Sequence, residues 1–188
     1  MNWPGAVQDV RLAAEWLASK GCKSIGVVGF CMVSNLYTLL YLSHYPKGGA
    51  LSLASSVHVP AINAGVCFYG IPPLQLADPI NLTIPMQYHF GDKDHSKGFA
   101  DIEACDSLRD KLEATGNFTI NETRHTSGEF VDVGARKSDG STVVLQEFHR
   151  YANGDHAFMN EEAPAYPYNK ECAQLAFSHS VSFFKSFL

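Results

Sequence analysis

The chain has 188 residues, of which 46% are hydrophobic, 12% aromatic and 18% charged. These values indicate one globular domain with a sizeable core and exclude a disordered chain. The formal net charge is −5, without a basic cluster, so we expect neither nucleic acid nor an anionic membrane as a partner.

The N-terminus and the cysteines indicate a cytoplasmic protein. No hydrophobic run reaches the length of a membrane span, and MNWPGAVQDV lacks the charged-then-apolar layout of a secretory signal. The cysteines are dispersed and form no C-x-x-C pair, which is typical of free thiols in a reducing compartment. They are Cys22, Cys31, Cys67, Cys105 and Cys172. The sequence leaves the oligomeric state open.

Helical and strand-like segments alternate along the first half of the chain. Residues 7–19 carry apolar side chains at 3.6-residue spacing, which predicts an amphipathic helix ended by Gly21. The apolar run 23–30 lacks alternation and predicts a strand buried on both faces. Further helices are predicted over 33–45 and 50–56.

The second half continues the same alternation. Strands are predicted over 64–70, 84–94 and 142–151, and amphipathic helices over 101–114 and 169–188. The polar, glycine-containing stretch 124–139 predicts a loop or a hairpin. Strands that alternate with helices imply an α/β domain with a parallel sheet flanked by helices, here spanning 1–188.

Reactive side chains follow three of these strands. Cys31 follows the first strand, Asp92 and Asp94 follow the third, and His156 follows the last. Chemistry in parallel sheets is found beyond the carboxyl ends of the strands. A nucleophile, an acid and a histidine in this chain order are typical of α/β-hydrolases. A thiolate would attack an acyl carbon, the imidazole would carry the proton, and the carboxylate would fix its tautomer.

The surrounding motifs resemble those of the dienelactone hydrolase family, which are G-x-C-x-G-G, G-x-x-D and G-x-H-x-F. The second motif favours Asp94 over Asp92. In motif order, the matching residues are Gly29 and Cys31, then Gly91 and Asp94, then Gly154, His156 and Phe158. The resemblance covers nearly the whole chain and leaves only 124–139 unassigned.

The resemblance implies hydrolysis of a small ester or lactone through an acyl-cysteine intermediate. Cys31 is then the nucleophile, His156 the base and Asp94 its orienting partner, and the backbone N–H of Met32 contributes to the oxyanion hole. No metal or cofactor is implied; His89 and His95 lie close in sequence, but nothing completes a zinc site. Bacterial members hold a substrate carboxylate with an arginine shortly after the histidine. The stretch HAFMNEE has no arginine, so the substrate stays open.

Two departures from the family pattern affect this interpretation. Val33 stands where the family has glycine, and removal of 33–47 gives GFCM-GGALSLASS, which restores the motif. We therefore interpret 33–47 as an insertion, either a retained in-frame intron or a natural loop.

The second departure concerns the N-terminus. Family members carry earlier strands, a loop with a second oxyanion donor and a glutamate that pairs with the resting thiol. We thus expect an α/β-hydrolase-like sheet without its first strands. The alternative function is a non-catalytic truncated or mis-spliced remnant.

Overall fold

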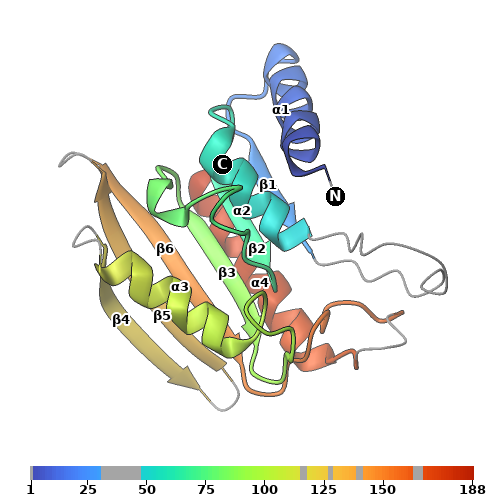
Figure 1. The fold of residues 1–188 in the computed structure, drawn as a ribbon, viewed down its shortest axis with the longest axis vertical. Coiled ribbons are helices and arrows are strands. Elements are labelled where there is room, and N and C mark those ends of the chain that lie inside the picture. Colours follow the sequence, from blue (N-terminus) through green and yellow to red (C-terminus); the bar gives the residue numbers. More distant parts are fainter. Residues whose placement is uncertain (1, 31–47, 115–117, 127–128, 139–141, 163–166) are drawn as a thin grey trace.

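The computed structural model describes residues 2–30, 48–114, 118–126, 129–138, 142–162 and 167–188. Its centre is a six-stranded sheet in the order β1-β2-β3-β6-β5-β4 (Figure 1). Four neighbouring strands are parallel: β1 (Gly26–Gly29), β2 (Ala64–Phe68), β3 (Met86–Gly91) and β6 (Thr142–Tyr151). The other two, β4 (Phe118–Thr126) and β5 (Glu129–Ser138), form an antiparallel hairpin that pairs with β6.

Four α-helices accompany the sheet in the described residues. They are α1 (Trp3–Ser19), α2 (Gly48–His58), α3 (Ile102–Ala114) and α4 (Lys170–Phe187), together with the short 3₁₀ helix η1 (Pro79–Asn81). Helices α2 and α3 lie on one face of the sheet and α4 on the other, while α1 packs against α2 (Figure 1). No helix among the described residues is long and apolar enough to cross a membrane.

The core explains why the central strands lack alternation. Every residue of β2 and β3 is buried, because helices cover both faces of the parallel strands. On the α3 face, the rings of Tyr88 and Phe148 stack at 4.3 Å between centroids. A smaller cluster, which includes Val7, Ala14 and Ile25, joins α1 and α2 to the first strand.

The predicted elements are largely confirmed, with boundary differences of a few residues. The hairpin alternative for 124–139 is correct, but its strands extend further and add an antiparallel edge to the sheet. Polar edge strands are common because charge discourages pairing with other chains, and their weak apolar pattern resembles that of a loop. The predicted helix over 33–45 lies outside the described residues.

Candidate active site

The loops after β3 and β6 are tied together by their backbones. The N–H of Lys93 donates to the carbonyl of Gly154 at 2.9 Å, and the N–H of Asp92 donates to Tyr151 at 3.0 Å. A Cβ on Gly91 would collide with the Gly154 carbonyl, and one on Gly154 would lie 3.1 Å from the Gly91 Cα. Position 91 therefore needs glycine because the two loops touch, whereas a Cβ at position 154 would require its neighbours to move slightly.

This contact brings Asp94 and His156 together. The Nδ1–H of His156 donates to the Asp94 Oδ2 at 2.6 Å, and both side chains are almost completely buried. The other carboxylate oxygen of Asp94 accepts the backbone N–H of Ser96 at 2.8 Å. With both oxygens engaged, the carboxylate has a fixed orientation, and it favours the imidazole tautomer that carries its proton on Nδ1.

Asp92 lies in the same loop but has a different partner. Its carboxylate is 25% exposed and accepts a long hydrogen bond of 3.4 Å from the Nε of Arg150. Arg150 also donates to Asp106 on α3. Asp92 thus belongs to a partly exposed ion-pair network, while Asp94 faces the histidine, as the spacing from Gly91 predicts.

Aromatic rings surround the imidazole of His156. The Tyr69 ring lies 5.4 Å from the His156 ring between centroids, and Phe158 lies edge-on to Tyr69 at the same separation. Tyr69 has a positive φ of 36° and Ala157 one of 57°, conformations that L-residues rarely adopt outside functional loops. Tyr69, backed by Phe158, thus forms an apolar wall beside the imidazole.

The end of β1 approaches the start of α2 closely. A Cβ on Gly29 would collide with the carbonyl of Gly48, and one on Gly48 would collide with the carbonyl of Phe30. A Cβ on Gly49 would collide with the carbonyl of Phe68 at the end of β2. Gly48 and Gly49, the two glycines that follow GFCM in the motif obtained by removal of 33–47, thus both lie in close backbone contacts.

Phe30, the residue before Cys31, connects this end of β1 to the histidine loop. Its ring stacks on Phe68 at 4.5 Å, and Phe68 contacts Tyr69 at 5.6 Å. Cys31, Met32 and the segment 33–47 lie outside the described residues. The structure therefore brings together two of the three predicted catalytic residues.

Ser96 is a site residue that we did not predict. Its N–H holds the Asp94 carboxylate, and its Oγ lies 3.4 Å from the His156 Nδ1. The sequence Asp-His-Ser contained the signal, because an aspartate commonly accepts the N–H of the residue two positions later.

A cavity near these loops is separate from the Asp94–His156 pair. It has a volume of about 490 Å³ and lies between the loop after β2, the loop after β3 and α3. Its walls are mostly apolar, and Lys97, Asp101 and Lys111 stand at its border. Neither Asp94 nor His156 lines it, so we do not assign it to the site.

Comparisons with known proteins show the family of the chain. The family model of the dienelactone hydrolase family matches residues 4–121 and 137–188. The chain belongs to the dienelactone hydrolase family. The match omits most of the β4–β5 hairpin, which is close to the stretch that the motifs left unassigned.

Two similar proteins illustrate how close the chain is to known sequences and structures. "Protein usf" of Aquifex pyrophilus is 27% identical over 167 residues, covering 88% of this chain and 52% of that protein. The crystal structure of a "Putative Dienelactone Hydrolase" from Klebsiella pneumoniae subsp. pneumoniae has a TM-score of 0.62 and 19% identity. The structural match covers 95% of the present chain and 60% of the Klebsiella protein chain. The chain thus spans about half the length of the curated relative, and its fold is that of a dienelactone hydrolase.

Proposed function

We propose that the protein hydrolyses a small ester or lactone through Cys31, His156 and Asp94. The observation that carries this proposal is the buried 2.6 Å hydrogen bond between His156 Nδ1 and Asp94 Oδ2. It joins the family's acid and base motifs beyond the carboxyl ends of β3 and β6, where α/β proteins perform chemistry.

The proposed reaction begins at the thiol of Cys31. Nε2 of His156 accepts the thiol proton, and the thiolate attacks the acyl carbon, so that a C–S bond forms and the carbonyl oxygen gains negative charge. The N–H of Met32 donates to this oxyanion. Collapse expels the alkoxide, which takes the proton from Nε2. Water, deprotonated by Nε2, then attacks the thioester carbon. The C–S bond breaks, the carboxylic acid leaves, and the thiolate takes the proton back from Nε2.

Asp94 acts through the imidazole. A proton fixed on Nδ1 leaves the Nε2 lone pair for proton transfer, and the carboxylate stabilises the imidazolium that forms in each step. The apolar wall of Tyr69 and Phe158 lowers the local dielectric, which strengthens this interaction. The stretch HAFMNEE contains no arginine that could hold a substrate carboxylate, so a neutral ester fits the site as well as an anionic lactone does.

The competing proposal is that the chain is a non-catalytic remnant of such a hydrolase. Intact mass after treatment with an acylating ester probe separates the two. We expect one adduct, mapped to Cys31 and absent from Cys31→Ser and His156→Ala.

A background of Cys22→Ser is needed because Cys22 is exposed. Burial raises the pKa of the thiols of Cys105 and Cys172, so neither should react in the folded protein. No adduct on Cys31 of folded protein would support the remnant.

A further inference from the structure

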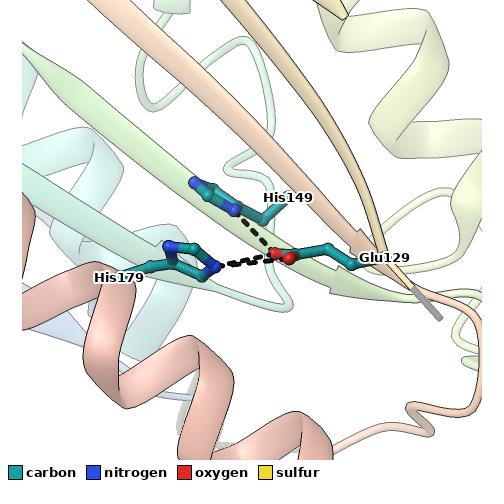
Figure 2. Close-up of side chains that lie close together, drawn as sticks. All are labelled: Glu129, His149 and His179. Carbon is teal, nitrogen blue, oxygen red and sulfur yellow. Dashed lines mark hydrogen bonds and ion pairs between the residues drawn. The ribbon is translucent and has the colours of Figure 1, made fainter. Parts of the chain in front are cut away.

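A second cluster of reactive side chains lies between the sheet and α4, and it uses none of the residues of the proposed active site. Glu129 comes from β5, His149 from β6 and His179 from α4 (Figure 2). The Glu129 carboxylate accepts hydrogen bonds from His149 Nδ1 at 2.9 Å and from His179 Nε2 at 3.1 Å. Figure 2 shows both rings directed at this carboxylate.

Strand pairing explains how two of these residues converge. Val131 of β5 pairs with His149 of β6, and Glu129 pairs with Tyr151. Glu129 and His149 are therefore diagonal neighbours on the same face of the antiparallel pair. Helix α4 covers that face and adds His179, whose ring lies 4.5 Å from the His149 ring between centroids.

We propose that Glu129, His149 and His179 form a binding site for a zinc-like divalent transition metal. The three donor atoms all lie within 4.8 Å of one another. Zinc bonds to histidine nitrogen or carboxylate oxygen are usually about 2.0–2.2 Å long, so donor atoms this close together can share one ion after the side chains adjust. Two histidines and one glutamate are also a common three-ligand set for zinc that keeps a fourth position open.

Glu147 supplies the support that a metal-binding histidine usually has. It lies two residues before His149 on the same face of β6, and its carboxylate accepts from His149 Nε2 at 3.4 Å. Gln87 of β3 holds the same carboxylate oxygen at 2.6 Å. A histidine that binds metal through one nitrogen commonly donates the other N–H to a carboxylate, which fixes the ring and raises its basicity.

A cavity provides access and room for a fourth ligand. It has a volume of about 200 Å³, and Glu147, His149, His179 and Ser182 contribute to its walls. Glu129 and His149 are 5% and 3% exposed at their side chains, while His179 is 30% exposed. A water needs about 30 Å³, so the cavity has room for a metal-bound water, and a metal could enter beside the partly exposed His179.

Burial would lower the pKa of His149, but its hydrogen bonds to Glu129 and Glu147 outweigh burial and raise that pKa, so a metal ion must displace a proton there. The carboxylates supply the negative charge of the cluster. Burial would raise the pKa of Glu129, but hydrogen bonds from His149 and His179 outweigh it and lower that pKa to about 2. The carboxylate is therefore ionised. Burial would likewise raise the pKa of Glu147, but hydrogen bonds from His149 and Gln87 lower it. Two carboxylates thus face His149 from opposite sides.

The test is titration of the chelator-treated full chain with Zn²⁺ against a chromophoric competitor. Cys22→Ser and Cys31→Ser form the background, because thiolates also bind zinc. We expect one zinc per chain. His179→Ala and Glu129→Gln should each weaken binding by more than about 100-fold, and Glu147→Gln by about 10- to 100-fold, the usual loss for a supporting residue.

The matched control is His58→Gln, an exposed histidine on α2 whose Nε2 bonds the carbonyl of Leu76. It should leave zinc affinity unchanged. His179 is half-buried on a helix, so His179→Ala should fold even if a change at the buried His149 does not; near-UV circular dichroism checks this. The Co²⁺ form should show a four-coordinate visible spectrum without a thiolate charge-transfer band. Equal zinc affinity in His179→Ala and His58→Gln, or a thiolate band, would overturn the proposal and leave the cluster as an ion-pair network.

Discussion

Replacement of Asp94 or of Asp92 by asparagine, one at a time, distinguishes the roles of the two carboxylates that follow β3. Asp94 has no exposed side-chain surface, and both its oxygens accept N–H groups, one from Ser96 and one from His156. In Asp94→Asn the new side chain has one oxygen and one NH₂ group, so one of the two N–H donors would face another donor. The least costly relief moves the histidine proton to Nε2, which removes the lone pair that the proposed chemistry needs.

The expected loss follows from this tautomer change. General-base catalysis contributes about 10²–10⁴ in rate, and the corresponding change in a serine protease reaches about 10⁴. Asp94→Asn should therefore raise the activation barrier by about 3–5 kcal/mol. One buried unsatisfied donor should also lower the free energy of unfolding by about 1–3 kcal/mol.

Asp92→Asn is the matched control in the same loop. The Asp92–Arg150 pair is partly exposed, and such pairs contribute about 0–1 kcal/mol. Loss of this ion pair in Asp92→Asn should change kcat/KM by less than about 5-fold. The assay is kcat/KM on a small activated ester, together with long-range ¹H–¹⁵N spectra of the His156 ring.

The spectra report the tautomer even when turnover is slow. The parent and Asp92→Asn should carry the His156 proton on Nδ1, and Asp94→Asn should carry it on Nε2. Equal kinetic effects of the two exchanges, or an unchanged tautomer in Asp94→Asn, would refute the assignment of Asp94 as the orienting residue.

Two further predictions concern stability. Gly91→Ala should destabilise the protein by about 1–3 kcal/mol, because its Cβ meets the Gly154 carbonyl; thermal unfolding should show a midpoint lower by about 2–12 °C. The control is His95→Ala at an exposed position of the same loop. An equally lowered midpoint in His95→Ala would contradict the importance of the contact between Gly91 and Gly154. Zinc at 100 times its Kd should raise the midpoint of thermal unfolding by about 5–11 °C. This rise should disappear in His179→Ala. If the rise persists in that variant, the metal binds elsewhere.

The sequence predicted the fold well because each central strand is short, apolar and followed by a helix-forming segment. It also predicted the pairing of Asp94 with His156, since motif spacing placed both residues directly after parallel strands. The preference for Asp94 over Asp92 depended on the distance from Gly91. The structure gives the physical reason, because Gly91 is where the two loops touch.

The metal-ligating cluster was not predictable in this way. Its members are 20 and 30 residues apart and come from β5, β6 and α4, whereas local zinc motifs place ligands a few residues apart. Glu129 also fell in the stretch that we expected to be a loop or hairpin. Only the register of β5 against β6, which no local pattern determines, brings Glu129 beside His149.

The contacts at the start of α2 are relevant to the question whether the segment 33–47 is an insertion. Gly29 and Phe30 at the end of β1 already touch Gly48 at the start of α2. Cys31 and Met32 alone, with three peptide links of at most about 10 Å, can therefore join Phe30 to Gly48. This is the connection in the restored motif, where a nucleophile stands at a sharp turn between strand and helix.

Deletion of 33–47 should therefore preserve the packing of α2 against β1 and β2. It removes the β-branched Val33 from the turn and the apolar stretch that contains Leu39, Leu40 and Tyr41, which lowers the risk of aggregation. We expect a higher soluble yield, an equal or higher thermal midpoint, and unchanged Nδ1 protonation of His156. A deletion of equal length elsewhere in a loop would not share these effects, because its ends would not be in contact. If the deleted chain fails to fold while the parent folds, then 33–47 is an integral part of the domain and not an insertion.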